Sequence, residues 1–152
     1  MTRNIEDMNK PTLRKPKAID IFCGCGGTTQ GLKDAGFSVV AGIEKDPLAV
    51  ATFRANHKRV KVWDGDICGL TPQKLMEHHG LRRGELDLLA GCPPCQAFSS
   101  MRRLNGKRRI HDRASKDLVF EYLRFVEGFH PKVVLIENVP RLSEDYRFDH
   151  NK

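Results

Sequence analysis

The sequence predicts an α/β fold built on a doubly wound, mostly parallel sheet of about five strands. Short apolar segments alternate with helical segments from Ala18 to Ile136. Several of the apolar segments are continuous runs, such as the one that begins at Val133, and this composition is typical of strands buried on both faces of a parallel sheet. Glycine, cysteine and acidic residues follow these runs. Ligands bind at the carboxyl ends of such strands, so this edge of the sheet is the expected site.

Each predicted strand is an apolar run, and two of the helices carry clear start signals. Asp46 and Thr71 each precede a proline, which predicts an N-cap followed by proline at the first helical position. The predicted strands span 18–22, 38–44, 60–63, 86–90 and 133–136, and the predicted helices span 28–35, 47–56, 71–79 and 115–127.

Composition and charge bound the class of protein. The 152 residues suffice for one domain with a core, and 39% of them are hydrophobic. No apolar run is long enough to span a bilayer, so we expect no membrane partner. Residues 1–17 are expected to form a flexible polar tail without the apolar centre of a secretory signal, which favours a cytoplasmic protein. The formal net charge of +7 favours a polyanionic partner such as nucleic acid.

Four of the five cysteines occur in two pairs near the ends of predicted strands. Cys23 and Cys25 form one pair, and Cys92 and Cys95 form the other. Four thiolates binding zinc is one interpretation of these pairs. It leaves the acids and glycines of the same edge without a role, so we expect no metal. Cys23, Cys25 and Cys92 are then expected to be small packing residues.

The glycine-rich turn at 23–27 and two strand-end acids predict a pocket for a nucleoside-bearing cofactor. Glycines let the backbone approach a ligand, but a dinucleotide fingerprint would need glycine where Thr29 stands. Glu44 ends the second strand about 20 residues after Gly24, where an acid accepts hydrogen bonds from ribose hydroxyls. Asp66 follows the third strand and could face an adenine amino group. S-adenosylmethionine fits best because it has no phosphate to neutralise. The alternative is that both acids are merely solvated.

Cys95 is the candidate nucleophile. Pro93 and Pro94 stiffen the chain before it, and the basic residues between 102 and 109 favour a thiolate. Glu137 follows the fifth strand as a candidate acid, and Asn138 could brace the Cys95 loop. A thiolate that adds to C6 of cytosine, with a carboxyl sharing a proton at N3, makes C5 able to accept a methyl group.

Five motifs, in this order along the chain, resemble those of the cytosine-C5 DNA methyltransferase family. They are IDIFCGCGG at 19–27, Glu44, DGDI at 64–67, PPCQ at 93–96 and ENV at 137–139. The resemblance covers roughly Lys17 to Pro140. It implies a Rossmann-like sheet of the S-adenosylmethionine-dependent methyltransferase type that is incomplete at about five strands. Residues 18–140 would be the first part of the catalytic domain.

The resemblance also implies a role for each motif position. Cys95 would be the nucleophile, and Glu137 would bind the edge of a cytosine flipped out of a DNA duplex. Residues 99–113 would form a mobile loop that closes over that base, although a solvated basic surface is the alternative. The other implied contacts are to the cofactor by Phe22, Gly24, Gly26, Gly27, Glu44 (ribose), Asp66 and Ile67 (adenine) and Pro94, and to the substrate by Gln96, Ser99, Arg102, Arg103 and Asn138.

Members of this family usually continue past the Glu-Asn-Val motif with further strands, a target-recognition domain and a final helix. Residues 141–152 are instead expected to be a polar tail, so the target-recognition domain is absent. We therefore expect little activity from the chain alone and a second polypeptide that supplies the later motifs. The chain could instead be a shortened gene product or an excised piece of a longer enzyme. The expected setting is restriction–modification.

Three other functions remain as alternatives. A branch of the same family with a similar Pro-Pro-Cys-Gln motif methylates tRNA. The chain could also be a non-catalytic module that binds S-adenosylmethionine, or a nicotinamide-dependent oxidoreductase.

Overall fold

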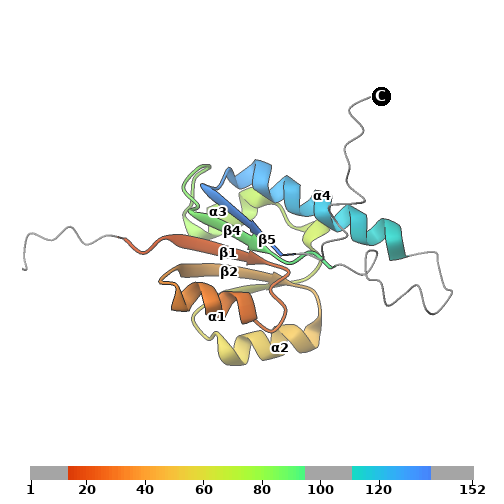
Figure 1. Cartoon of the computed structure of the whole chain (residues 1–152), viewed down its shortest axis with the longest axis horizontal. Helices are drawn as coiled ribbons and strands as arrows, with labels where there is room; N and C mark the ends of the chain where they lie inside the picture. Colours follow the sequence, from red (N-terminus) through yellow and green to blue (C-terminus); the bar gives the residue numbers. More distant parts are fainter. Residues whose placement is uncertain (1–13, 95–110, 138–152) are drawn as a thin grey trace, which may run out of the picture.

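Five parallel strands form one sheet in the computed structural model, which describes residues 14–94 and 111–137, with the backbone alone for 111–117 (Figure 1). The strand order is β3-β2-β1-β4-β5, and every neighbouring pair is parallel. The chain moves outward from β1 in one direction and then in the other, so the sheet is doubly wound, as predicted. The strands are β1 (Lys17–Ile21), β2 (Ser38–Glu44), β3 (Lys61–Asp64), β4 (Leu88–Gly91) and β5 (Val133–Ile136).

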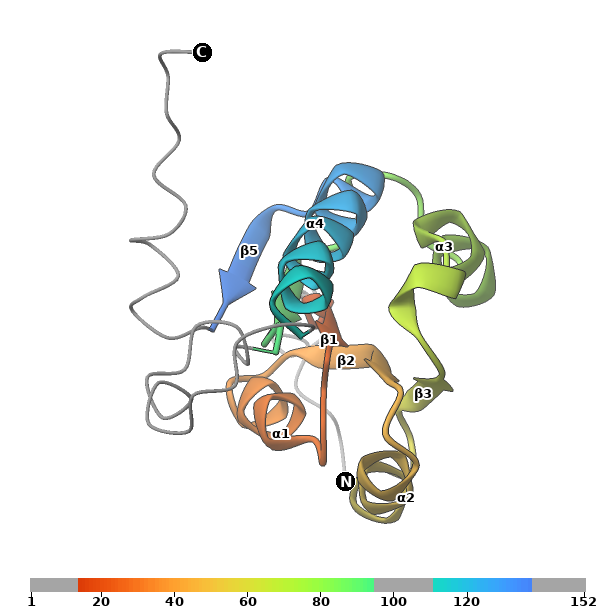
Figure 2. The same ribbon diagram turned by 90° about the vertical axis from the view of Figure 1, so that its right-hand side faces the viewer.

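Helices cover both faces of the sheet (Figure 2). One face carries α1 (Gly27–Asp34) and α2 (Pro47–Asn56), and the other carries α3 (Pro72–His79) and α4 (His111–Phe129). Each helix buries an apolar stripe against the strands, which is the main source of stability in such a layered fold. The buried helical side chains in the two apolar clusters are Leu32, Val50 and Phe53 on the first face and Leu75, Tyr122, Phe125 and Phe129 on the second.

The elements predicted from the sequence are present, with shifts at some ends. The predicted N-caps are confirmed: Asp46 Oδ1 accepts from the backbone N–H groups of Leu48 and Ala49, and Thr71 Oγ1 accepts from that of Lys74. The strand predicted at 86–90 begins at Leu88, where pairing with β1 begins.

Two helical features were not predicted. The helix predicted at 115–127 begins at His111 and continues through Gly128, where the missing Cβ lets Pro72 of α3 approach. A short 3-10 helix, Ile67–Gly69, follows β3.

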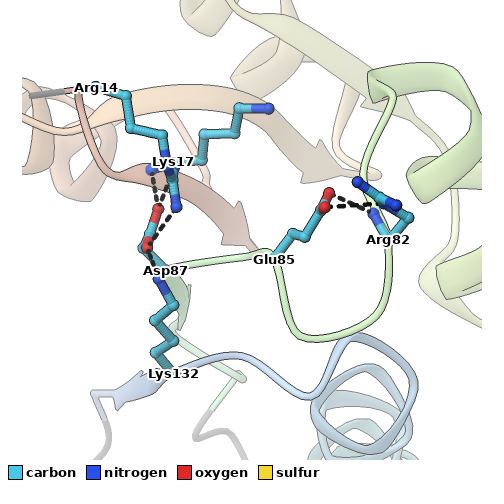
Figure 3. A network of polar contacts seen from close by, with 6 residues as sticks. All are labelled: Arg14, Lys17, Arg82, Glu85, Asp87 and Lys132. Atoms are coloured by element: carbon cyan, nitrogen blue, oxygen red, sulfur yellow. Dashed lines mark hydrogen bonds and ion pairs between the residues drawn. The ribbon is translucent and has the colours of Figure 1, made fainter. Parts of the chain in front are cut away.

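Charged groups fasten the amino ends of three strands together around Asp87 (Figure 3). Its carboxylate accepts hydrogen bonds from Arg14 at 2.8 and 3.1 Å, from the Lys17 backbone N–H at 2.8 Å and from Lys132 Nζ at 2.7 Å. Burial raises the pKa of Asp87, but the donors from Lys132, Lys17 and Arg14 outweigh it and hold that pKa well below its usual range. β1 begins at Lys17 and Arg14 pairs with Asp87, so these two residues of the predicted tail contact the sheet.

The edge strand β5 is open to solvent along its whole length. The exposed fractions of Val133, Val134, Leu135 and Ile136 are 55%, 44%, 45% and 43%. Successive residues of a strand point to opposite faces, so both faces of β5 are uncovered by the described residues. No helix in 14–94 or 111–137 is long and apolar enough to cross a membrane.

Candidate active site

A pocket of about 120 Å³ lies at the carboxyl edge of the sheet. Residues after the ends of β1, β2, β3 and β4 line it, and Leu118 of α4 closes one side. Glu44 and Asp66 were predicted from their places at strand ends, and Phe22, Ile67 and Pro94 were implied by the family resemblance. The pocket is lined by Phe22, Glu44, Asp66, Ile67 and Pro94 of the predicted set, and by Ile43, Lys45, Gly65, Cys92 and Leu118.

The turn after β1 has a strained backbone. Phe22, Gly24 and Gly26 have φ values of 59°, 52° and 95°. This region favours glycine, so Phe22 is held there by its surroundings at a cost of about 1–2 kcal/mol. Its ring packs on the core and lines the pocket. The predicted positions Gly24, Gly26 and Gly27 therefore form the tight turn between β1 and α1.

His57, which the sequence interpretation missed, supports this turn from α2. Its ring is buried, with Nε2 at 3.0 Å from the Gly26 carbonyl oxygen and Nδ1 at 2.9 Å from Lys33 Nζ. A lysine ammonium can only donate, so Nδ1 accepts and Nε2–H donates to Gly26. A Cβ on Gly26 would lie 2.2 Å from Nε2, which explains why only glycine fits.

Glu44 is held rigidly at the pocket rim by backbone donors. Its Oε2 accepts from the N–H of Gly24 at 3.0 Å, and its Oε1 accepts from those of Lys45 and Asp46 at 2.8 Å each. These bonds fix the carboxylate between the β1 turn and the start of α2. Among these contacts Oε2 has one donor, so it keeps the capacity to accept from a ligand hydroxyl.

Asp66 lies across the pocket from the β1 turn and starts the 3-10 helix. Its Oδ1 accepts from the Cys68 backbone N–H at 3.0 Å, and its Oδ2 lies 3.9 Å from Lys45 Nζ. The Cys68 hydrogen bonds lower the pKa of Asp66, and the Lys45 charge lowers it further against the opposing effect of burial. Oδ2 thus remains an ionised acceptor beside the buried Ile67.

Asp20 is fully buried in β1, directly before the turn. Its Oδ2 accepts from Thr29 Oγ1 at 2.6 Å, while Oδ1 has no hydrogen-bond partner among the residues of 14–94 and 111–137. Burial raises the pKa of Asp20 to about 6, partly offset by the Thr29 hydrogen bonds. Thr29 therefore braces the carboxyl under the turn, which explains threonine where a dinucleotide fingerprint has glycine.

The ends of β4 and β5 bring Pro94 and Glu137 to the same edge. The Glu137 backbone N–H donates to the Gly91 carbonyl at 3.1 Å. Cys92 lines the pocket rather than only packing, and its sulfur lies 3.8 Å from Thr28 Oγ1. Burial raises the pKa of the Cys92 thiol, the Thr28 contact lowers it, and the charges of Asp20 and Glu137 raise it. The predicted residues outside the described ranges are Cys95, Gln96, Ser99, Arg102, Arg103 and Asn138.

The two sulfurs of the first cysteine pair lie in different environments. Cys23 is buried, and burial raises the pKa of its thiol, whereas Cys25 is exposed and is not a packing residue. In the parts of the chain that the structure describes, no group of three histidine, cysteine or acidic residues is arranged to hold a metal ion.

Comparisons with known proteins show the family of this chain. The sequence model of the family "C-5 cytosine-specific DNA methylase" matches residues 16–150. The type II methyltransferase M.AgeI of Thalassovita gelatinovora is 41% identical over 81% of the chain, which spans 28% of that protein. M.AquIA of Picosynechococcus sp. is also 41% identical over 81% of the chain, which spans 48% of it.

A solved structure shows the same fold. It is a crystal structure assigned as a DNA modification methyltransferase encoded within an Escherichia coli prophage, with 29% identity and a TM-score of 0.72. It matches 88% of the chain, which covers 35% of that protein. The chain thus spans less than half the length of these relatives.

Proposed function

Because the chain belongs to the C-5 cytosine-specific DNA methylase family, we propose that it carries the cofactor pocket and the nucleophile of a DNA cytosine-5 methyltransferase. Its substrate is a cytosine flipped out of duplex DNA, which chemistry on a stacked base requires. The names of the type II relatives support a role in restriction–modification. Such an enzyme works in the cytoplasm, where the DNA is accessible.

One observation carries this proposal: residues from four strand ends converge on one pocket. Glu44 ends β2, and Phe22, Asp66 and Pro94 follow β1, β3 and β4. Pro94 is the residue before Cys95, and Glu137 follows the neighbouring strand β5. A sulfur, a carboxyl and a cofactor pocket at one edge are what methylation of cytosine at C5 needs.

S-adenosylmethionine fits the residues of the pocket. The apolar side chains Phe22, Ile67 and Leu118 suit the flat adenine, and Asp66 Oδ2 suits its amino group. Glu44 Oε2 has capacity for a ribose hydroxyl. When bound, this cofactor supplies an electrophilic methyl group. The backbone of Gly24, Gly26 and Gly27 and the ring of Pro94 complete the predicted contacts.

The residues of the chain prepare the cytosine. The Cys95 sulfur adds to C6, and Glu137 holds a proton at N3 so that the negative charge formed in the ring is neutralised. C5 then has enamine character and can accept a methyl group. Loss of the C5 proton restores the ring and expels the sulfur. Gln96, Ser99 and Asn138 position the base, and Arg102 and Arg103 bind phosphates.

Full activity requires polypeptide beyond residues 18–140, the first part of the catalytic domain. The relatives are two to nearly four times longer than the region they share with this chain. The open edge strand β5 supports a covering partner. We propose that polypeptide carrying the later motifs and the target-recognition domain fills that role, either as a second subunit or as a further part of the same enzyme.

Trapping with 5-fluorocytosine tests the nucleophile. Fluorine at C5 cannot leave as a proton, so the Cys95 adduct accumulates and survives denaturing electrophoresis. Single-stranded and duplex oligonucleotides and a tRNA, each with this base, are incubated with the chain and S-adenosylmethionine. We expect a low yield of DNA adduct that Cys95→Ala abolishes and that Cys25→Ala, at an exposed sulfur outside the pocket, leaves unchanged.

Three outcomes contradict the proposal in different ways. An adduct that still forms in Cys95→Ala would show that Cys95 is not the nucleophile. An adduct on tRNA but not on DNA moves the substrate to RNA. Failure of calorimetry to detect binding of S-adenosylhomocysteine, the demethylated cofactor, removes the cofactor assignment. Glu44→Ala is expected to weaken that binding at least ~10-fold through loss of a charged hydrogen bond to ribose.

A further inference from the structure

We propose that Arg124 is a positioning residue that sets the adenine-side wall of the pocket, and that it thereby controls which nucleobase the pocket accepts. The inference rests on the proposed cofactor. Arg124 belongs to α4 and does not line the pocket itself. It acts through the 3-10 helix Ile67–Gly69: Ile67, its first residue, and Asp66, its N-cap, form that wall.

Arg124 hydrogen-bonds two carbonyl groups of this short segment. Its Nη2 donates to the Ile67 oxygen at 3.0 Å and to the Leu70 oxygen at 2.9 Å. Its Nε donates to Glu121 Oε2 at 2.9 Å, one turn earlier in the same helix. The Glu121 carboxylate thus fixes the Arg124 guanidinium, and the guanidinium fixes the turn. The Cζ atom of Arg124 also lies 4.8 Å from the Phe125 ring centroid.

The segment needs such support because it is short. A 3-10 helix of three residues has few internal bonds and poor hydrogen-bond geometry. Here the Gly69 and Leu70 N–H groups donate to the Asp66 and Ile67 carbonyls, both at 3.1 Å. The Asp66 carboxylate accepts from the Cys68 N–H at 3.0 Å within the same turn and lies 3.9 Å from Lys45 Nζ. Its position therefore depends on where the whole turn is held.

Helix α4 thus shapes two walls of the pocket. Leu118 lines one side directly, and Arg124, about two turns later, holds Ile67 on the other. The width available to a flat base is set by the distance between α4 and the turn. Loss of Arg124 lets the turn move relative to α4, which displaces Asp66 from the base edge it would bind.

The test compares two ligands that differ only at the edge facing Asp66. S-adenosylhomocysteine carries the 6-amino group of adenine, and S-inosylhomocysteine carries a carbonyl there instead. Calorimetry with the full chain gives the ratio of their dissociation constants. We expect a preference for the adenosyl ligand of ~10-fold or more in the unchanged protein, the size of one charged hydrogen bond. In Arg124→Ala we expect a preference below ~3-fold, with affinity for the inosyl ligand nearly unchanged.

Two further variants separate positioning from general damage. Arg83→Ala removes an arginine that also donates to a backbone carbonyl, that of Glu127, away from the pocket, and it should keep the full preference. Arg124→Lys keeps the charge but not the fork that reaches both carbonyls, so an intermediate preference is expected even if Arg124→Ala does not fold.

The possible failures are distinguishable. Equal weakening of both ligands in Arg124→Ala, with the ratio kept, would show a merely structural role and overturn the inference. A full preference in Arg124→Lys would overturn it too. If the unchanged protein binds both ligands equally, the inference falls while the cofactor assignment stands. If it binds neither, the proposed function has failed and the inference falls with it.

Discussion

Replacing Asp20 by asparagine should make stability less dependent on pH. The carboxyl is fully buried, and burial raises its pKa from 3.8 to about 6. A raised folded-state pKa means that the fold prefers the protonated form. Stability from this group is therefore complete below pH 4 and is lost as pH rises through 6. Asparagine keeps the shape and does not titrate, so the variant lacks this loss.

The magnitude follows from the two pKa values. A rise from 3.8 to about 6 corresponds to about 3 kcal/mol over the full titration, because each pH unit is worth about 1.4 kcal/mol. About 2 kcal/mol of this falls between pH 4.5 and pH 8. The new amide adds a constant cost of about 1–3 kcal/mol if its N–H groups lack partners, but that cost does not change with pH.

Urea denaturation of both proteins at several pH values measures the effect. The difference in the free energy of unfolding, variant minus unchanged protein, should rise by about 2 kcal/mol from pH 4.5 to pH 8. Thr29→Val, which removes the hydroxyl donor to Asp20 Oδ2, should enlarge the pH dependence of the protein that keeps Asp20. A difference that stays flat across this range, or that falls, would refute the reasoning.

Two other substitutions have matched controls. Gly26→Ala should destabilise the fold by about 3 kcal/mol, because φ is 95° and the new Cβ meets the His57 ring, whereas Gly31→Ala, with open space in α1, should stabilise it by about 0.5–1 kcal/mol in the same thermal melts. Asp87→Asn should lower the free energy of unfolding by about 2 kcal/mol at pH 7. This loss should shrink below pH 4, because a carboxyl whose pKa is lowered in the folded state stabilises the fold only above its unfolded pKa of 3.8. Glu85→Gln, at the exposed Arg82 pair, should leave the denaturation curve nearly unchanged, and equal losses of stability at both positions would contradict this account.

The strand order was not predicted, but the strands and their parallel pairing were. Apolar runs such as the one at Val133 identify strands, and the helices between them require parallel connections. The 3-10 helix could not be predicted, because it depends on Arg124 from a helix more than 50 residues later in the chain. The early start of α4 at His111 was missed because the residue before it, Ile110, is not of a type that favours an N-cap.

Some residues of the candidate site could likewise be predicted from the sequence, and others could not. Glu44 and Asp66 could be placed because a parallel sheet brings the ends of its strands to one edge. His57 and Arg124 could not, because they act on backbone carbonyl groups, and no sequence spacing marks such contacts. The prediction that Cys25 packs was wrong, because a glycine-rich turn can bury one cysteine and expose another two residues later.

The bare edge of β5 has a consequence for handling the protein. Four consecutive aliphatic side chains are exposed on β5, and no strand within 14–94 or 111–137 pairs with its outer side, so strands of other molecules can add there. Purified chain should therefore form larger species as its concentration rises, and light scattering would detect them. Whatever polypeptide normally covers β5 acts as a solubilising cap, so synthesis of the two in the same cell should raise the yield.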